Sequence, residues 1–476
     1  MSRSTPLTRA RRLLRKAFSQ EGLDLTSGSI GKPLFLLSIP IVMTNLFQVA
    51  YNLADTFWVG QYSTEALAAI SFAFPMVFLL ISLGMGLAVA GSVMVAQNVG
   101  AGNEREAQYA ASQTIAFAVV SSLVLGGVGY FVVDDLLRIF GAAPDVFPLA
   151  VGYMRIISLG LVFMFGFLMF VSLMRGYGDT VTPMIVMFFS VVLNIVLDPF
   201  LIFGWWVFPR LGLEGAAIAT IFARALAFVA GLAIMFGGVR GVEINLPDMR
   251  PDAAFARRIL RIGAPASVEM TGRALSINLM LLVVGLFPTP VVAAFGIGTR
   301  MLSVVFMPAI AVARGVETMS GQNIGADQQD RAAETARFAA KAMFVVLSVI
   351  GLVGWIWAPT FVSVFTTDPA VVDIGVTFMR FVAPSFGFMG IMRAYNGSFR
   401  GAGKTLTAAA IAIGTNGFVR LPFAYVAAEF LGSNGIWLAF AVSNVVGSVA
   451  AYAWYQRGTW RKVDLTEEPG PSPADD

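Results

Sequence analysis

Twelve long apolar segments follow one another along this chain, and each is long enough to cross a lipid bilayer, since a spanning helix needs about 20 apolar residues. Apolar residues make up 57% of the chain and charged residues only 13%. A soluble core does not grow to this size, so we expect an all-α polytopic membrane protein. The predicted spans are 34–58, 66–96, 107–133, 146–174, 181–208, 213–236, 263–287, 291–320, 333–357, 371–398, 405–430 and 433–456.

Basic residues outside these spans fall mainly on one side of the predicted membrane. With a cytoplasmic N-terminus, the inner loops hold residues such as Arg105 and Lys404, whereas the outer loops hold Arg138 and Arg210. Cytoplasmic loops of membrane proteins carry an excess of Lys and Arg. We therefore predict a multi-pass protein of the cell membrane, plasma or inner, with both termini cytoplasmic. The formal charge of +4 follows from this topology and indicates no nucleic-acid partner.

The second half of the sequence repeats the first half in one constant register. Pro40 matches Pro265, and Gln97 matches Gln322 without a gap between the two positions. Each half has six spans, an even number, so both halves insert the same way up. Parallel repeats are related by an axis along the membrane normal. We expect two six-helix bundles related by a pseudo-two-fold axis, facing each other across a central cavity.

Five segments make up the predicted domain organisation. They are a basic cytoplasmic N-terminal arm (1–33), an N-terminal six-helix bundle (34–236), a cytoplasmic linker (237–262), a C-terminal six-helix bundle (263–456) and a cytoplasmic tail (457–476). The arm is rich in arginine and can lie on anionic lipid, although its role stays open.

Neither Cys nor His occurs in the chain, which removes several kinds of chemistry. Thiolate nucleophiles, His-based zinc sites and Ser-His-Asp triads are excluded. We find no other nucleophile–base pair and expect a protein that is not an enzyme and needs no cofactor. The Gly401–Thr405 turn imitates a phosphate-binding loop, but Ser398 stands where that motif needs Gly, so no ATP use is expected.

Polar residues inside the first span form a stripe. Asn45, Gln48, Asn52 and Asp55 fall within about 80° of one another at 100° per residue. A stripe of this kind faces a cavity or another helix rather than lipid. We take Asn45, Gln48 and Asn52 as cavity or substrate candidates, and Asp55 as a candidate for ion coupling.

A second polar group lies in the fifth span. Asn194 and Asp198 are spaced i, i+4, and Pro199 frees a backbone carbonyl one turn back. These oxygens suit Na⁺, or a shielded carboxylate that takes H⁺. In the register of the repeat Asp55 falls on Met280, and Asp198 also lacks an acidic counterpart. We therefore place the coupling site in the first bundle.

Two pairs of opposite charge lie in the seventh and eighth spans. Glu269 and Arg273 are spaced i, i+4, and Arg314 and Glu317 are spaced i, i+3, so each pair can interact within its own helix. Both pairs fit a structural role as well as a functional one. Glu269 and Arg273 are further cavity candidates, and whether Glu269 takes part in coupling stays open.

These motifs resemble the multidrug and toxic compound extrusion (MATE) family, and the Asn194/Asp198 pair resembles its DinF-like branch. The resemblance implies a V-shaped pair of bundles acting as a monomer, and efflux of amphipathic, often cationic drugs in exchange for inward H⁺ or Na⁺. It also implies that Asp55, Asn194 and Asp198 form the first-bundle cation site, a possible Na⁺ site. Thr220 matches a further threonine ligand.

Other functions stay open on sequence alone. A flippase or exporter of a lipid-linked saccharide from the same superfamily would favour a basic cavity, and we expect few Lys or Arg on the helices that line the cleft. From a different class, a membrane-embedded enzyme or a channel is the alternative. Because the candidate charges of the cavity are acids, we expect cationic substrates to be preferred.

Overall fold

The computed structural model describes residues 24–462 apart from 140, 142 and 239, and the described chain is almost entirely helical. Most of the predicted N-terminal arm and residues 463–476 of the predicted tail lie outside the described residues. Eleven described helices are long and apolar enough to span a membrane, and one bent helix pair supplies a twelfth span. The all-α fold with twelve predicted spans is thereby confirmed.

The first lobe contains six spans built from seven helices. The fourth span is bent by 52° between its two helices, where Gly160 ends the first of them. The helices are α2 (Gly31–Tyr62), α3 (Thr64–Gly100), α4 (Glu104–Ile139), α5 (Phe147–Leu159), α6 (Leu161–Tyr177), α7 (Val181–Phe203) and α8 (Leu213–Phe236).

The second lobe repeats this plan with more interruptions. The eleventh span of the chain, which belongs to this lobe, contains a π-helical stretch, η3, between two α-helices. The elements from the linker onward are η1 (Leu246–Met249), α9 (Ala253–Val284), α10 (Thr289–Gly325), α11 (Gln329–Ile356), α12 (Ala358–Ser363), α13 (Pro369–Val382), η2 (Ala383–Ser385), α14 (Phe386–Gly401), α15 (Thr405–Ile413), η3 (Gly414–Val419), α16 (Arg420–Leu431), α17 (Ser433–Gln456) and η4 (Thr459–Lys462).

The segment between the lobes is more ordered than a simple linker. Helix α9 begins at Ala253 rather than at 263, because the Asp252 side chain caps it by accepting a hydrogen bond from the Ala254 backbone. Val242 is buried against the first lobe, and Arg105 forms an ion pair with Asp248. The hydrogen bond from Arg105 holds the pKa of Asp248 below its usual range.

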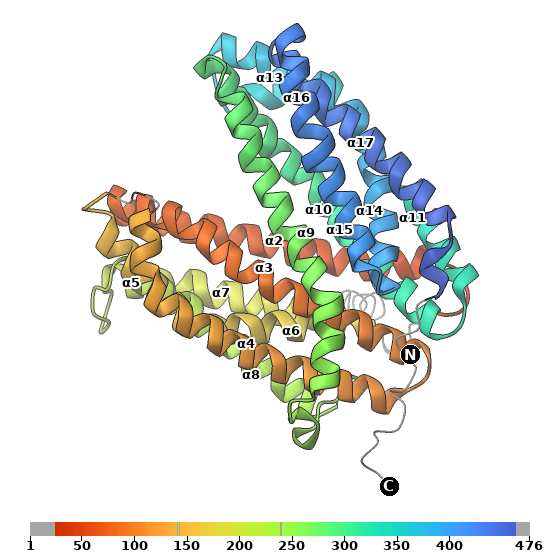
Figure 1. Ribbon diagram of the computed structural model, residues 1–476. Helices are drawn as coiled ribbons and strands as arrows, with labels where there is room; N and C mark the ends of the chain where they lie inside the picture. The colour runs from red at the N-terminus through yellow and green to blue at the C-terminus, as the bar shows by residue number, and fades with distance from the viewer. Residues whose placement is uncertain (1–23, 140, 142, 239, 463–476) are drawn as a thin grey trace, which may run out of the picture.

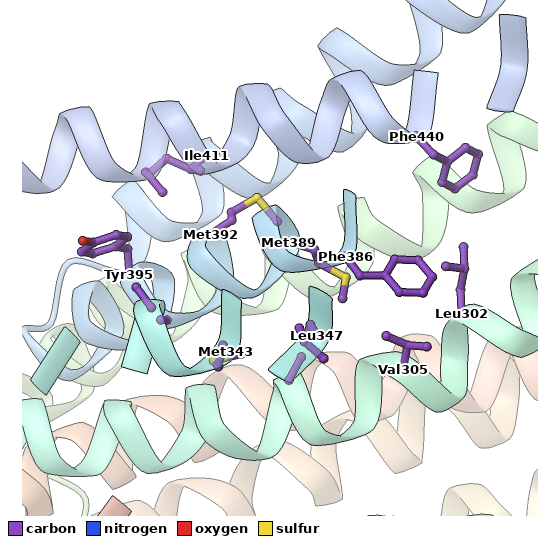
Figure 2. Close-up of a cluster of buried hydrophobic side chains, with 14 of the residues drawn as sticks. Leu302, Val305, Met343, Leu347, Phe386, Met389, Met392, Tyr395, Ile411 and Phe440 are labelled. Carbon is purple, nitrogen blue, oxygen red and sulfur yellow. The ribbon is translucent and has the colours of Figure 1, made fainter. Parts of the chain in front are cut away.

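The core of the second lobe surrounds α14. Figure 2 shows Phe386, Met389 and Met392 of this helix among side chains from neighbouring helices, including Met343 of α11 and Ile411 of α15. Methionine adapts its shape to irregular gaps between helices. The Met and Phe residues of α14 therefore contribute mainly to packing, and this packing holds the polar residues of the same helix in place.

The two lobes meet near one end and diverge toward the ends marked by α5 and α13 (Figure 1). Their contact is pseudo-symmetric. Gln97 Nε2 donates to the carbonyl of Gly401 (2.8 Å), and Gln322 Nε2 donates to that of Gly176 (3.1 Å). Both hydrogen bonds follow the register of the sequence repeat, in which Gln97 matches Gln322 and Gly176 matches Gly401. The repeated Gln-Asn-x-Gly-Ala segments thus join the lobes.

Candidate functional site

A buried group of carboxylate and amide side chains lies in the first lobe. Asp55 of α2 is 8% exposed, and Asp198 of α7 is fully buried next to Asn194. The Asn194 Nδ2 donates to Asp198 Oδ1 at 3.1 Å. The two carboxylates lie within electrostatic range of each other. The structure therefore brings the three predicted coupling residues to one place between α2 and α7.

Three oxygens of this group have no hydrogen-bond partner among the described residues. They are Asp55 Oδ1, Asn194 Oδ1 and Asp198 Oδ2, and all three are buried. A buried polar atom without a partner is costly, so these oxygens suit a cation or a proton. Among the described residues, no three acidic side chains gather as they would for a multivalent metal. Two carboxylates and an amide fit a monovalent ion better.

Local sequence explains why α7 offers these oxygens. Helix α7 continues through Pro199, which has no N–H to donate to the carbonyl of residue 195 one turn back. Asn194 and Asp198 stand on the same face at i, i+4 spacing. The helix thus presents two side chains close to a turn whose backbone bonding is incomplete.

Thr220 joins the group through a residue that we did not predict. Its hydroxyl lies 2.8 Å from the hydroxyl of Tyr51, and Thr220 is buried on α8. Tyr51 stands one turn before Asp55, and Tyr153 of α5 is an electrostatic neighbour of both carboxylates. Apart from the spacing of Tyr51 to Asp55, the sequence carries no signal for these tyrosines.

Arg224 is a second residue that sequence reasoning missed. Its guanidinium donates to Gln48 Oε1 at 2.9 Å and lies over the rings of Tyr51 and Phe167. The signal was available, because Arg224 is the single basic residue in the predicted sixth span and stands one turn after Thr220. It places one positive charge beside Tyr51, which stands one turn before Asp55.

The predicted stripe on α2 is divided between two environments. Asp55 is buried, Gln48 and Asn45 are half-buried, and Asn52 is exposed. Gln48 Nε2 donates to Asn52 Oδ1 at 3.1 Å. Asp55 therefore belongs to the interior of the first lobe, whereas Asn52 lies at its surface, and Gln48 links Asn52 to the buried Arg224.

The second lobe holds a buried ionic network. Arg400 of α14 binds Glu269 of α9 (3.0 Å) and Glu317 of α10 (3.1 Å), and Arg314 also binds Glu317 (2.8 Å). The Arg314–Glu317 pair therefore forms as its spacing suggested. Glu269 does not pair with Arg273 in the described chain, because Arg400 donates to both of its carboxylate oxygens.

Arg273 lies instead over the ring of Phe306, 5.0 Å from its centroid. Arg393 and Arg420 are further basic residues within the spans of this lobe, and neither forms an ion pair in the described chain. The second lobe thus holds more basic side chains in its spans than we expected. Each lobe therefore holds a buried arginine in addition to its acids, Arg224 in the first lobe and Arg393 in the second.

Comparison with known families supports the same division into two halves. The family model described as MatE matches residues 40–200 and again residues 265–426. The two matches start at Pro40 and at Pro265, which are equivalent positions of the internal repeat, and together they cover more than half of the chain. The chain belongs to the MatE family. This confirms the family resemblance of the sequence motifs, and the protein is a membrane transporter rather than an enzyme.

Relatives and solved structures within this family extend over nearly the whole chain. A "Probable multidrug resistance protein YpnP" of Bacillus subtilis (strain 168) is 31% identical over 94% of this chain and 99% of its own length. A "FAD transporter" of Shewanella oneidensis (strain ATCC 700550 / JCM 31522 / CIP 106686 / LMG 19005 / NCIMB 14063 / MR-1) is 28% identical over 91% of this chain and 96% of its own length.

One similar structure is described as "Reverse polarity of binding pocket suggests different function of a MOP superfamily transporter from Pyrococcus furiosus Vc1 (DSM3638)". It matches with a TM-score of 0.84 and 23% identity over 93% of this chain and 99% of that chain. At this level of identity the likeness concerns the fold, and it supports the two-lobed architecture of this MatE family member.

Proposed function

We propose that this protein is a secondary active antiporter that exports amphipathic small molecules in exchange for inward H⁺ or Na⁺. The observation that carries the proposal is the set of three buried oxygens without partners, on Asp55, Asn194 and Asp198. Oxygen ligands suit hard cations such as Na⁺, and a buried carboxylate equally accepts a proton. One site can therefore couple to either ion.

Alternating access follows from the way the lobes meet. The contact through Gln97 and Gln322 lies toward the loops that are rich in Lys and Arg, which we assign to the cytoplasm. With both termini cytoplasmic in the cell membrane, the lobes diverge toward the outside. Breaking this inner contact and closing the outer ends would expose substrate to the other side, without ATP and within one monomer.

The chemical class of the substrate is inferred from the relatives. The relatives named above are described as a multidrug resistance protein and a FAD transporter, and both descriptions fit organic molecules with a large apolar or aromatic part. The preference for cations was inferred from acids in the spans. We assign Asp55 and Asp198 to the coupling ion, which leaves the cation preference without its main support. The alternative of a saccharide flippase is not favoured by these relatives.

Transport by purified protein in liposomes tests the function. Export of an amphipathic dye is measured under an imposed Na⁺ gradient and, separately, under an imposed H⁺ gradient. We expect one gradient to drive export, and Asp55→Asn and Asp198→Asn to lower driven export at least about tenfold, because Asn keeps the shape but removes the charge. The matched control is Asp373→Asn, which alters an exposed carboxylate of α13.

The proposal fails if Asp198→Asn retains gradient-driven export at the rate of the control variant. It also fails if neither gradient drives export in liposomes that contain correctly folded protein.

A further inference from the structure

Three buried or half-buried arginines within the spans of the second lobe stand apart from its ionic network. They are Arg273 of α9, Arg393 of α14 and Arg420 at the start of α16. No carboxylate binds any of them in the described chain. Charged side chains inside a membrane protein are costly and mark binding sites or ion paths more often than they mark packing. The three residues therefore require an explanation.

The acids of the second lobe do not balance these arginines. Glu269 and Glu317 both bind Arg400, and Glu317 also binds Arg314. The two carboxylates of the network thus neutralise Arg400 and Arg314. Arg273 and Arg393 form no ion pair among the described residues, and Glu269, an acidic neighbour of both, is bound by Arg400.

Arg393 is the most informative of the three. It is 8% exposed, its Nε has no hydrogen-bond partner, and its guanidinium donates to no described residue. Its charged neighbours are Arg273, Arg314 and Arg400 against the single acid Glu269. An arginine carries five N–H donors in a fixed plane. A guanidinium whose Nε is buried without a partner, in a positive environment, suits an anionic acceptor.

Phe306 of α10 brings Arg393 and Arg273 together. The guanidinium of Arg273 lies 5.0 Å from the centroid of this ring, and that of Arg393 lies 5.9 Å from it. An aromatic face attracts a cation but accepts no conventional hydrogen bond. The ring therefore contacts two like charges that are electrostatic neighbours, without satisfying their donors. An anion bound by both would relieve their repulsion and fill their hydrogen bonds.

Arg420 plays a different part. It donates to Ser443 and Asn444 and lies over Phe440 at 4.3 Å, so much of its hydrogen bonding is internal. It is nevertheless a charged neighbour of Arg273. Arg420 thus adds to the positive potential around the pair without offering the same unused donors.

We propose that Arg273 and Arg393 form a subsite that binds the anionic group of the exported substrate, a phosphate, sulfonate or carboxylate. The substrate class is an amphipathic molecule with an apolar or aromatic body and one such group. Two guanidinium forks suit these planar or tetrahedral oxyanions. The inference rests on the proposed export function and deepens it by naming the charge of the cargo, which is opposite to the one expected from sequence.

The coupling ion and the anionic group of the substrate then bind in different lobes. The cation site uses Asp55 and Asp198 in the first lobe, whereas the anion subsite lies between α9, α10 and α14 in the second. The coupling ion and the substrate therefore do not compete for the same side chains. Coupling between them must act through the packing of the lobes, as two sites linked by a common conformational equilibrium.

Two fluorescent probes with the same aromatic skeleton test the subsite. 8-Anilinonaphthalene-1-sulfonate carries a sulfonate, and N-phenyl-1-naphthylamine lacks it. Saturable binding of each is measured on purified protein in nanodiscs, after subtraction of empty nanodiscs and without any ion gradient. We expect the sulfonate probe to bind at least about tenfold more tightly than the neutral probe, as charge-assisted hydrogen bonds predict.

Substitutions of the two arginines test whether they cause the preference for the sulfonate probe. Arg393→Gln and Arg273→Gln should each lower the affinity for the sulfonate probe about tenfold or more, leaving the neutral probe within about twofold, and Arg393→Lys should retain part of it. The matched control is Arg380→Gln, an exposed arginine of the same lobe that lies over Trp355. If Arg393→Gln does not fold, Arg273→Gln, at a half-buried position, decides the question.

Equal affinities for the two probes, no saturable binding of the sulfonate probe, or a preference that survives both Gln variants would overturn the subsite. Because binding is measured without a gradient, its outcome is independent of whether an ion gradient drives export. A protein that exports in a coupled manner but shows no anion preference retains the proposed function and loses only the subsite.

Discussion

Single buried charges in this protein fall into two kinds, and their partners separate them. Glu269 and Glu317 are held by arginines at 2.8 to 3.1 Å, as a structural network requires. Asp55 and Asp198 have no basic partner within hydrogen-bond distance in the described chain. Burying a charge without a partner is unfavourable, so carboxylates left in this condition are the ones suited to reversible binding of an ion.

Removing the charge of Glu317 should destabilise the protein rather than alter coupling directly. Glu317→Gln leaves Arg314 without its ion pair and Arg400 with only Glu269. Breaking one partner of a buried pair costs about 3–5 kcal/mol, so we expect a fall of several degrees in the melting temperature, measured by thermal unfolding of purified protein. Glu429→Gln, at an exposed position of α16, should stay near the unmutated value. An unchanged melting temperature in Glu317→Gln would mean that the network is not required for stability.

Individual helices in this fold depend on small residues where two lobes touch. A side chain at Gly100 of α3 would place its Cβ 1.9 Å from the carbonyl oxygen of Gln322, and one at Gly325 would place it 1.8 Å from that of Gln97. Such distances are far inside contact distance. Glycine is therefore needed at the ends of α3 and α10, because only a missing Cβ allows the backbones to approach.

Gly325→Ala should weaken closure of the lobes while leaving each lobe folded. The added methyl group pushes α3 away and disturbs the hydrogen bonds of Gln97 and Gln322. We expect export to fall at least about tenfold, as a displacement of about 1 Å can produce in other systems. The control is Gly296→Ala in the same helix, where a Cβ meets nothing within 4 Å and where Ala should favour the helix by about 1 kcal/mol.

The two variants are compared by initial export rates in liposomes at matched protein density. Similar rates in both would show that the close approach of α3 and α10 is not needed for transport.

The whole molecule consists of two packed lobes that share an interface. Separate buried clusters fill the first lobe, and a large cluster fills the second. The lobes meet through the symmetric Gln97 and Gln322 hydrogen bonds and also along α3 and α9, where the hydroxyls of Ser82 and Thr271 lie 3.0 Å apart, and they diverge toward the ends marked by α5 and α13 (Figure 1). Packed interiors resist deformation, so the expected motion is rotation of one lobe against the other, with this contact opening and closing.

A reversible cross-link across the contact should stop transport. A Cβ at Gly321 would lie 3.0 Å from the Cβ of Ala96, close to the Cβ spacing of about 3.5–4.5 Å in a disulfide. The chain has no native Cys, so Ala96→Cys with Gly321→Cys introduces the single possible bridge. We expect oxidation to abolish export and dithiothreitol to restore it, measured on the same liposomes.

Each single Cys variant should be insensitive to oxidant. Full export by the completely cross-linked protein would contradict a cycle in which the lobes separate on this side.

Much of the architecture was readable from the sequence because it depends on local pattern. Span length and apolar content determine which segments cross a membrane, and the constant register between the two halves indicated two similar bundles. The chain also revealed the Asn194/Asp198 pair through i, i+4 spacing, a distance that one helix fixes by itself. The bend between α5 and α6 and the early start of α9 were not foreseen, since tertiary packing influences where helices break and begin.

Only the tertiary structure decided which charges meet. The i, i+4 spacing of Glu269 and Arg273 allows these two side chains to pair within α9. Glu269 instead binds Arg400, which lies 131 positions away, because α9 and α14 belong to one lobe and bury these side chains together. Packing within the second lobe also places Arg393 and Arg273 against Phe306. Packing within the first lobe places Arg224 beside Gln48. A sequence specifies which side chains share a helix face, but the energy of a buried charge depends on its neighbours from other helices. Which charges of the second lobe are paired and which are not therefore becomes clear only from the tertiary structure.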